Sequence, residues 1–481
     1  MSELSRKLVG LEKKQPIKVV QFGEGNFLRA FVDFAIQQLN KAAGFNAGVA
    51  VVQPIEHGMV DMLNKQDGLY NLFLKGFSKG KEIQEAELVS SIVKGINPYS
   101  DFDAYLELAR EEELQFIISN TTEAGIAYEA ADTPEMKPPG SFPAKLTLLL
   151  YERFQFFKGD KQKGLTIIPC ELINYNADTL RDIMVQYIEE WKLGDGFKEW
   201  LLNNSTFHNT LVDRIVPGYP REDIDAYNQQ LPYKDNLIVT AESFFLWVIE
   251  GDEALKQKLP FHKTSLDVKI VKDMQPYRTR KVRILNGAHT SMVPISILYG
   301  TTTVKESVDD EFIGTFINKA VFDEIIPTLD MDKDELVNFA EEVFDRFRNP
   351  FIKHQLASIA LNSISKFKVR VLPSLLEYQS NHNKIPTNLT FAFACLIRFY
   401  KGNWKGQPLP VNDSEEVVNE LSNVWEMDSY DKISTAVLKN KSFWDQDLTQ
   451  IANLPEAISY ALQQIDENGI QLAFDNFTKK Y

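Results

Sequence analysis

The sequence predicts two domains: an α/β domain with a parallel sheet over residues 1–265 and a mostly α-helical domain over residues 266–481. Three observations support this prediction. The length of 481 residues exceeds what one hydrophobic core normally supports. Short apolar runs alternate with helical stretches in the first half of the chain, which is typical of parallel strands joined by helices. After a last strand-like stretch at residues 266–271, the remaining segments have mostly helical patterns.

The first elements are a strand, a glycine turn and a helix. Residues 16–22 form a short apolar run that ends at Gly23, and we interpret it as a buried strand. Apolar residues then recur at helical spacing, at Phe31, Phe34, Ala35 and Leu39. A second apolar strand at residues 48–53 ends before Pro54, so the beginning of a strand–helix–strand unit is expected.

The rest of the first domain continues this pattern. Hydrophobic and polar residues partly alternate in two segments, which predicts a pair of exposed strands at 69–74 and 87–93. Further buried strands are expected at 115–120 and 164–169, and a loop at 131–140. In the second domain, helices are expected at 332–347, 389–400 and 413–426.

Charge and composition exclude several classes of protein. The chain has 52 basic and 67 acidic residues, a net charge of -15, whereas nucleic-acid binding proteins carry a basic excess. The N-terminus leads into no apolar segment, and the most apolar windows are far shorter than the roughly 20 residues of a membrane span. Cys170 and Cys395 are expected to be reduced thiols. We expect a cytoplasmic protein with no nucleic-acid or membrane partner.

A glycine turn follows the first strand. Gly23-x-Gly25 opens a helix, where backbone N–H groups and the helix dipole can hold a pyrophosphate. The third glycine of a Rossmann-like pattern is replaced by Leu28, and a tight turn without a ligand is the alternative. The second strand ends in Gln53, and the nearest acid is Glu56, with no arginine for a 2′-phosphate. This favours NAD over NADP.

Lys281, Asn286 and His289 are candidates for proton-transfer chemistry. On an ideal α-helix the offsets place Asn286 roughly 140° and His289 roughly 80° from Lys281, on one arc. A lysine that exchanges a proton, an amide that holds an oxyanion and an orienting imidazole would form a usable site. A packed helix with hydrogen-bonded polar groups is the alternative. The six histidines lack zinc-site spacing, so no metal is expected.

Five motifs occur in the order seen in one enzyme family. They are Gly23-x-Gly25-Asn26-Phe27-x-Arg29-Ala30, Gln66-Asp67-Gly68-Leu69-Tyr70, Thr122-Glu123-Ala124-Gly125, Val212-Asp213-Arg214-Ile215-Val216-Pro217 and Lys281-x-x-x-x-Asn286-Gly287-x-His289. In these motifs the chain resembles the long-chain mannitol dehydrogenase family, from about residue 17 into the second domain. The resemblance implies a Rossmann-like N-terminal domain, a helical C-terminal domain and metal-independent hydride exchange between nicotinamide and a secondary alcohol.

The resemblance also implies roles for individual residues. Lys281 would be the general acid/base, Asn286 would hold the carbonyl or alkoxide oxygen, and His289 would orient the substrate. The residues expected along the cofactor phosphates are Gly23, Gly25, Asn26, Phe27 and Arg29. Thr122 and Glu123 would lie near the nicotinamide. Asp213 would support the site, or would form a structural ion pair with Arg214 or another basic residue.

One motif departs from that of the polyol-oxidising relatives. They carry an asparagine at the position of Leu172, in Cys170-Glu171-Leu172, and this asparagine would share the oxyanion with Asn286. Asn174 is our preferred substitute and Asn176 the other candidate. Both are otherwise ordinary turn residues.

The sequence at residues 21–31 and 169–173 resembles that of the family members that interconvert D-tagaturonate and D-altronate, so a sugar-acid substrate is expected. Fructuronate reductase and a mannitol-type polyol dehydrogenase are the alternatives, and an NAD-sensing regulator without turnover is a third. The substrate carboxylate requires a forked donor, and Arg214, Arg278, Arg280 and Arg283 remain open candidates. The oligomeric state, monomer or dimer, also remains open.

Overall fold

The computed structural model describes residues 1–78, 81–122 and 124–481, which divide into two compact units. Unit 1 comprises residues 1–75 and 83–274, and the described part of unit 2 comprises residues 76–78, 81–82 and 275–481. The division falls after residue 274, whereas 265 was expected. The reason is that β12 (Asp267–Val271) pairs in parallel with β11 (Leu246–Glu250) of unit 1.

Unit 1 is built on a six-stranded sheet with the strand order β5-β2-β1-β6-β7-β8. Its strands are β1 (Ile17–Phe22), β2 (Gly48–Val52), β5 (Ile92–Ile96), β6 (Phe116–Ser119), β7 (Thr166–Pro169) and β8 (Thr206–Phe207). Every neighbouring pair in this sheet is parallel. The predicted parallel sheet is therefore confirmed, and its first strand lies at the centre.

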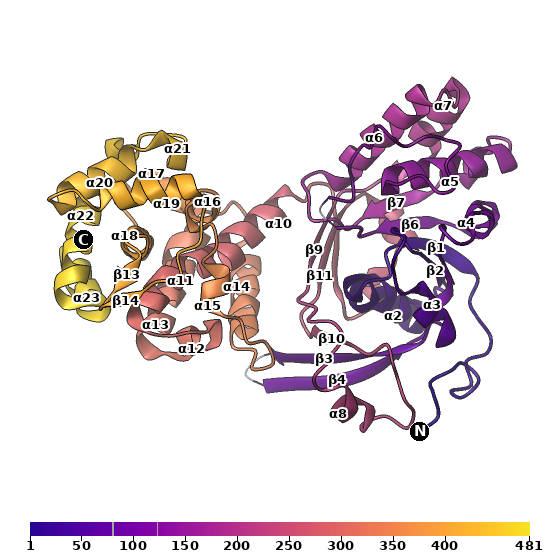
Figure 1. Cartoon of the computed structure of the whole chain (residues 1–481), viewed down its shortest axis with the longest axis horizontal. Helices are drawn as coiled ribbons and strands as arrows, with labels where there is room; N and C mark the ends of the chain where they lie inside the picture. Colours follow the sequence, from indigo (N-terminus) through magenta and orange to yellow (C-terminus); the bar gives the residue numbers. More distant parts are fainter. Residues whose placement is uncertain (79–80, 123) are drawn as a thin grey trace. The chain divides into compact units, whose positions relative to one another are not determined.

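Helices cover both faces of this sheet (Figure 1). Val19 packs into one hydrophobic core with α2 (Phe34–Ala43). Its neighbour Val20 packs into a second core with α5 (Phe142–Phe156) and α6 (Asn176–Glu190). Because successive side chains of a strand point to opposite faces, a strand buried on both faces carries adjacent apolar residues, as β1 does at Val19 and Val20.

The remaining helices of unit 1 are shorter. They are α1 (Asn26–Leu28), α3 (Val60–Lys65), α4 (Phe102–Glu107), α7 (Asp195–Asn204), α8 (Ile224–Asn228) and α9 (Glu253–Lys258), with a π-helical segment η1 (Arg29–Asp33). Helix α1, η1 and α2 follow one another without a break, so the helix after the glycine turn spans residues 26–43. Residues 131–140 form turns and bends, as predicted.

Two three-stranded sheets complete unit 1. They contain β3 (Tyr70–Ser78), β4 (Lys81–Val89), β9 (Thr210–Asp213) and β10 (Val239–Glu242), in the orders β10-β3-β4 and β12-β11-β9. The predicted exposed pair is wrong in two respects. Strand β3 is largely buried at residues 70–74 because it is the middle strand of its sheet. The segment 87–93 is divided between the end of β4 and the beginning of β5.

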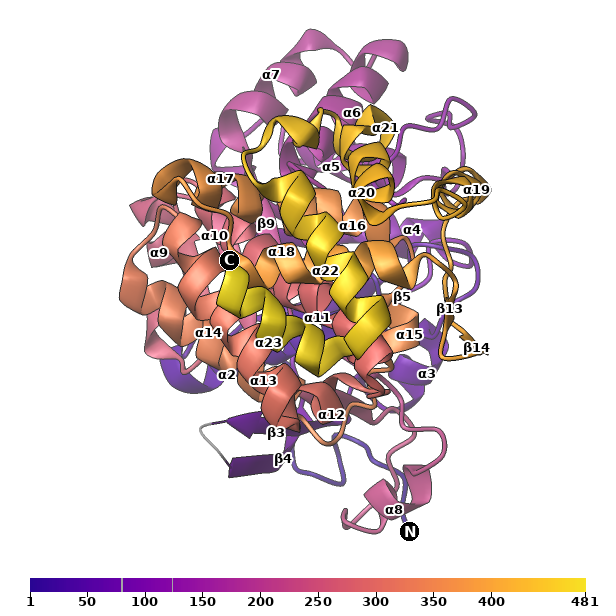
Figure 2. The same cartoon turned by 90° about the vertical axis from the view of Figure 1, so that its left-hand side faces the viewer.

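Unit 2 is mostly helical, as predicted, and Figure 2 shows its helices stacked around α18. Its main helices are α10 (Gln275–Arg280), α11 (Gly287–Tyr299), α12 (Val304–Asp309), α13 (Glu311–Lys319), α14 (Lys333–Phe347), α15 (Leu356–Ile359), α16 (Ser363–Arg370), α17 (Leu372–His382), α18 (Thr387–Phe399), α19 (Glu415–Val424), α20 (Tyr430–Lys439), α21 (Lys441–Trp444), α22 (Leu454–Asn468) and α23 (Ile470–Lys480). A small hairpin is formed by β13 (Asn403–Trp404) and β14 (Gln407–Pro408). Helix α18 is buried from Asn388 to its end, and both α11 and α22 pack against it.

The three helices predicted for this unit are present as α14, α18 and α19. Helix α14 begins where the Asp332 side chain accepts a hydrogen bond from the backbone N–H of Glu335, which is a typical helix cap. Across the described residues, no helix combines the length and hydropathy that a membrane span requires. Cys170 and Cys395 are both buried and unpaired.

Candidate active site

The glycine turn follows β1 in unit 1, and Gly23 is required by the fold itself. Its φ is +119°, a conformation that L side chains rarely adopt. A Cβ at this position would lie 2.9 Å from the carbonyl oxygen of Asn120 and 2.9 Å from Cδ1 of Leu28. Leu28, which replaces the third glycine of the pattern, packs into the space that Gly23 leaves. The missing third glycine is therefore compatible with a tight strand–helix contact.

Gly25 is different, because none of the residues that the structure describes requires a glycine there. Its φ of -67° suits any residue, and a Cβ would meet no described atom within 4 Å. Gly25 is exposed at the N-terminal end of the helix over residues 26–43, where the first backbone N–H groups have no partners within the helix. Phe27 is partly exposed in this first turn and stacks on Phe31. The open space at Gly25 fits the close approach of a dinucleotide pyrophosphate.

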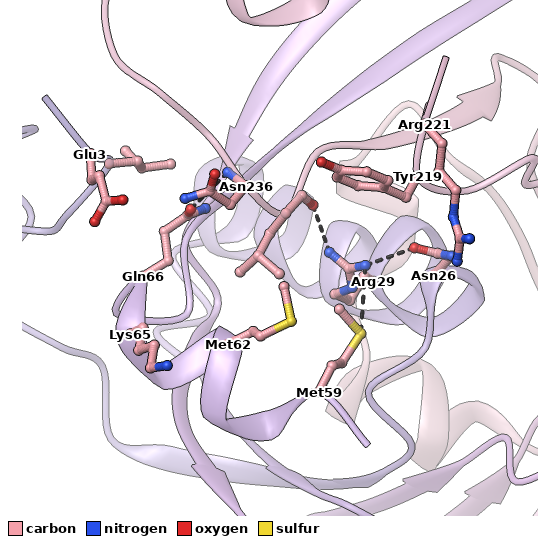
Figure 3. Close-up of a pocket in the computed structure, with 12 residues that line it drawn as sticks. Glu3, Asn26, Arg29, Met59, Met62, Lys65, Gln66, Tyr219, Arg221 and Asn236 are labelled. Atoms are coloured by element: carbon pink, nitrogen blue, oxygen red, sulfur yellow. Dashed lines mark hydrogen bonds between the residues drawn. The ribbon is translucent and has the colours of Figure 1, made fainter. Parts of the chain in front are cut away.

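Arg29 is fully buried, and its two terminal nitrogens are bonded within the protein (Figure 3), whereas its Nε has no hydrogen-bond partner among the described residues. Its two terminal nitrogens donate to the carbonyl oxygen of Leu237 and to Oδ1 of Asn26, each at 2.7 Å. Burial lowers the pKa of the guanidinium. Arg29 holds Asn26 in place, and direct contact of Arg29 with a phosphate does not fit this arrangement.

Asn26 and Arg29 line a cavity of about 680 Å³ within unit 1. Its wall also contains Glu3, Leu4, Met59, Met62, Lys65, Gln66, Tyr219, Arg221, Asn236 and Leu237 (Figure 3). The glycines of the turn do not line this cavity. The predicted cofactor residues are therefore divided between the open turn at Gly25 and the cavity beside Arg29.

The carboxyl ends of β6 and β7 are joined by Glu171. Its buried carboxylate accepts hydrogen bonds from the Ser119 hydroxyl and from both the backbone N–H and the hydroxyl of Thr121, all at 3.0 Å. Burial raises the pKa of Glu171, and these hydrogen bonds oppose the shift. The next residue, Thr122, is exposed with φ +83°, and Glu123 lies outside the described residues. That Glu171 connects Ser119 and Thr121 was not predicted from the sequence, although the Cys170-Glu171-Leu172 motif contains this residue.

The two asparagines proposed to replace the missing oxyanion donor differ sharply. Asn176 is buried, and its Nδ2 donates to the carbonyl oxygens of Pro169 at 3.0 Å and Glu171 at 3.1 Å. Its Oδ1 accepts from the backbone N–H of Thr210 at 3.0 Å. These bonds occupy Asn176, so it does not suit an oxyanion. Asn174 is exposed in the turn before α6, and Leu172 is also exposed.

Arg214 has a structural environment within unit 1. Its guanidinium donates to the carbonyl oxygens of Glu242 at 2.9 Å and Ala30 at 2.6 Å, and it lies over the rings of Phe34 and Phe245. Burial lowers its pKa to about 10. Arg214 therefore fastens the Val212–Pro217 motif to the helix after the glycine turn.

In unit 2, the segment that carries the proton-transfer candidates is one continuous helical stretch, but it is not a regular α-helix. Lys281–Asn286 form a π-helical segment, η5, between α10 and α11. The i→i+5 hydrogen bonds of a π-helix widen the turn, so each residue advances by less than the 100° of an α-helix. The angles expected from α-helical geometry are therefore wrong, although Lys281 and Asn286 are both partly exposed along this stretch. Such π segments occur frequently at functional sites.

Two arginines anchor this segment. Arg280 is buried, pairs with Glu335 at 2.9 Å and lies over the ring of Phe339. Arg283 donates to the hydroxyl of Ser374 at 2.8 Å and pairs with Glu377 at 3.1 Å. Because each positive charge has a carboxylate partner, these arginines are structural anchors of η5.

His289 occupies a confined position at the start of α11. Its ring stacks on Phe347 at 4.3 Å and meets the His354 ring edge-on at 5.2 Å. Its Nε2 is inaccessible and has no hydrogen-bond partner among the described residues. Burial, together with positive charge from neighbouring side chains, lowers the pKa of His289 well below its ordinary value. The imidazole is therefore neutral near pH 7, and it has an unused nitrogen.

The basic side chains that act on His289 come from other parts of unit 2, and they were not predicted from the sequence. They are His354, in the loop before α15, and Arg346, Arg370 and Lys366, on α14 and α16. Arg370 donates to the hydroxyl of Thr290, the residue after His289, at 3.5 Å. In the part of the chain that the structure describes, no three His, Cys, Asp or Glu residues are grouped so that they could hold a metal ion.

A parallel sheet with a cofactor-type glycine turn, and a helical unit with a lysine, an amide and a neutral imidazole on one helix, define a two-domain dehydrogenase of the Rossmann type. The chain belongs to the mannitol dehydrogenase family. Residues 17–263 match the model of the mannitol dehydrogenase Rossmann domain, and residues 273–466 match that of the mannitol dehydrogenase C-terminal domain. These matches confirm the resemblance inferred from the motifs.

Two curated relatives are similar to this chain over nearly their whole length. The altronate oxidoreductase of Yersinia enterocolitica is 46% identical over 467 residues, which is 96% of this chain and 97% of the relative. The altronate oxidoreductase of Bacillus subtilis (strain 168) is 46% identical over 479 residues, 99% of this chain and 98% of the relative.

Two solved structures share the fold. A D-sorbitol dehydrogenase in substrate-free form has a TM-score of 0.81 at 21% identity, with 98% of this chain and 100% of that chain covered. The mannitol 2-dehydrogenase of Pseudomonas fluorescens, in a complex with NAD and D-mannitol, has a TM-score of 0.66 at 18% identity, with both chains fully covered.

Proposed function

We propose that this protein is a tagaturonate reductase, also called altronate oxidoreductase, which reduces D-tagaturonate to D-altronate with NADH. The observation that carries this proposal is the 46% identity to altronate oxidoreductases of two distant bacteria over nearly complete chains. The substrate is a small sugar acid, and we propose a cytoplasmic location because both cysteines are free thiols. In this proposal, unit 1 binds the cofactor, and unit 2 binds the substrate and carries the catalytic residues.

When bound, NADH supplies a hydride to the keto carbon. Lys281 donates a proton from its ammonium group to the carbonyl oxygen as the alcohol forms, and the neutral amine then regains a proton from solvent. Asn286 donates a hydrogen bond to the same oxygen and stabilises its developing negative charge. His289, which is neutral near pH 7, orients the substrate. In the reverse direction Lys281 is the base.

The glycine turn would hold the cofactor pyrophosphate with backbone N–H groups, because the space above Gly25 is open. At the end of β2, the side chain of Gln53 donates to the carbonyl oxygens of Ile55 and Glu56, both at 2.9 Å, and so holds this turn. The exposed charge at the turn is the carboxylate of Glu56. A carboxylate there favours the ribose hydroxyl of NAD over the phosphate of NADP.

In unit 1, we propose Thr122 and Glu123 as residues near the nicotinamide, because they follow β6 at the carboxyl edge of the sheet, where ligands of such folds bind. Asn174 remains the proposed second donor to the oxyanion, because its neighbour Asn176 is fully occupied by internal hydrogen bonds.

The decisive experiment is a substrate panel. The purified protein is mixed with tagaturonate, fructuronate or fructose, each with NADH or NADPH, and the loss of absorbance of the reduced cofactor is followed. We expect the highest kcat/KM with tagaturonate and NADH. A higher kcat/KM with fructuronate or fructose would contradict tagaturonate as the substrate. Binding of NADH without any turnover would contradict an enzymatic function and support an NAD-sensing regulator.

The role of Lys281 is tested by substitution. Lys281→Ala should reduce kcat by about 100-fold or more, which is the usual contribution of general acid–base catalysis, and should leave NADH affinity nearly unchanged. Lys305→Ala is the control, because Lys305 is an exposed lysine of the same unit that pairs with Asp309. Turnover of Lys281→Ala close to that of the unmodified protein would rule out the catalytic assignment.

A further inference from the structure

The four arginines considered from the sequence as carboxylate donors all have other partners. Arg214 donates to two backbone carbonyl groups, and Arg280 and Arg283 pair with Glu335 and Glu377. Arg278 also interacts with other residues of the chain. Arg280 and Arg283 are thus bound to glutamates, and Arg214 is buried with two of its nitrogens bonded, although its Nη2 has no hydrogen-bond partner among the described residues. These three side chains do not present an accessible guanidinium fork to a substrate carboxylate.

Arg370 is the last residue of α16 and lies beside the segment that contains Asn286 and His289. Its backbone carbonyl oxygen approaches Gly287 so closely that a Cβ there would lie 3.1 Å away. Its side chain reaches Thr290, one residue beyond His289. The arginine thus lies beside the first turn of α11, which contains His289 and directly follows Asn286.

The guanidinium of Arg370 is partly buried and poorly satisfied. Its side-chain hydrogen bond to Thr290 is 3.5 Å long, and Arg370 forms no ion pair with any residue that the structure describes. Burial lowers its pKa, and among the described residues no acidic side chain opposes this shift. Arg280 and Arg283, in contrast, each have a glutamate partner. A partly buried cation without an anion is costly, and an anionic ligand would offset that cost.

The surroundings of Arg370 add positive charge. His354, Arg346 and Lys366 act on the pKa of His289 together with Arg370. Lys366 also interacts with the carboxylate of Asp413, and Arg346 has further interactions within the chain. In a chain with a net charge of -15, a concentration of basic side chains around one imidazole indicates a site for an anion.

We propose that Arg370 binds the carboxylate of the sugar-acid substrate and is the residue that selects sugar acids over neutral polyols and ketoses. This inference rests on the proposed function and deepens it. A keto-hexuronate carries its carboxylate at the opposite end of the carbon chain from the keto group. One anchor must therefore hold the carboxylate while Lys281 and Asn286 act on the keto oxygen. The planar fork of a guanidinium matches a carboxylate with two parallel hydrogen bonds.

The test compares an acid substrate with its neutral counterpart. Arg370→Gln, Arg370→Lys and the unmodified protein are assayed with tagaturonate and with D-tagatose, which lacks the carboxylate. For Arg370→Gln we expect kcat/KM for tagaturonate to fall by about 10- to 100-fold, mainly through KM, because hydrogen bonds to charged groups contribute on this scale. The low activity with tagatose should not change. Arg370→Lys keeps the positive charge but lacks the planar guanidinium, so its kcat/KM for tagaturonate should fall less than that of Arg370→Gln.

Lys368→Gln is the matched control, because Lys368 lies on the same helix and pairs with Asp445. It should leave both activities unchanged. An equal fall of both activities in Arg370→Gln and Arg370→Lys would indicate a structural role and overturn the proposal, as would an unchanged preference for tagaturonate.

A second measurement does not depend on turnover. Thermal shift titrations with D-altronate and with a neutral alditol compare binding to the unmodified protein and to Arg370→Lys, which retains the positive charge. We expect altronate to stabilise the unmodified protein more strongly, and this difference to shrink in the variant. If the unmodified protein binds altronate but has a higher kcat/KM with another keto acid, tagaturonate is not its preferred substrate, and the inference that Arg370 binds the carboxylate is retained. If altronate binds both proteins equally, the inference about Arg370 fails.

Discussion

The two glycines of the turn after β1 should respond to alanine in opposite ways. At Gly23, alanine would have to adopt a φ of +119° and would place its Cβ 2.9 Å from a backbone oxygen. Backbone strain of about 1–3 kcal/mol and overpacking of about 1–3 kcal/mol together predict a loss of about 2–6 kcal/mol in the free energy of unfolding. At Gly25, the ordinary φ and the empty space predict a change within about 1 kcal/mol.

Cofactor binding should show the reverse pattern at Gly25. A methyl group there would occupy the space proposed for the pyrophosphate, so Gly25→Ala should weaken NADH binding by about 10-fold or more, or at least about 1.4 kcal/mol. Urea denaturation measures the stability of both variants, and a fluorescence titration with NADH measures their affinity. If Gly25→Ala binds NADH as tightly as the unmodified protein, the pyrophosphate does not pass over this turn. A fully stable Gly23→Ala would contradict the steric argument.

Two further predictions concern the turn after β7 and a buried acid of unit 2. Asn174→Ala should lower kcat with little change in stability. Asn176→Ala should destabilise the protein by about 1–3 kcal/mol, because the buried partners of Asn176 lose their hydrogen bonds. Steady-state kinetics and denaturation curves of both variants distinguish the two effects. Burial raises the pKa of Glu324 to about 7, although it accepts hydrogen bonds from Asn388 and Leu389. In the folded protein Glu324 keeps its proton up to about pH 7, whereas in the unfolded chain it releases the proton above about pH 4.5. As the pH rises through 7, Glu324 should therefore lower the free energy of unfolding by up to about 3 kcal/mol. Glu324→Gln should remove that part of the pH dependence in denaturation curves, and an unchanged curve would contradict the shift.

The fold was largely predictable because its signals are local. The apolar run of β1 and the glycine turn after it indicated a buried parallel strand that opens a helix, and both are present. The pairing of β3 was not predictable in the same way. Its alternating pattern suggested an exposed strand, and only the distant strand β10 makes it the middle strand of a sheet. The edge of a sheet depends on partners that the strand's own sequence does not contain.

The candidate site was predictable only in part, for a related reason. Lys281, Asn286 and His289 lie within nine residues, so a motif could identify them, but the π-helical segment between them could not be read from apolar periodicity. The choice between Asn174 and Asn176 depended on which side chain is buried against β9, and both are polar residues of one turn. Burial and partner choice are properties of packing, which a single sequence specifies only through the whole fold.

The environment of Arg370 is a clear example of a property that depends on packing and not on a sequence motif. By sequence it is one basic residue in the segment Lys366-Phe367-Lys368-Val369-Arg370, and nothing in that pattern separates it from Lys368. In the structure, Lys368 points to a carboxylate partner, whereas Arg370 points to Thr290 and has no carboxylate partner among the described residues. Arg280 and Arg283, which lie in the proposed proton-transfer motif, pair with glutamates of other helices and hold those helices together. A residue that binds a substrate carboxylate has to be left without an internal ion pair, and Arg370, on a neighbouring helix, meets this requirement of the proposal.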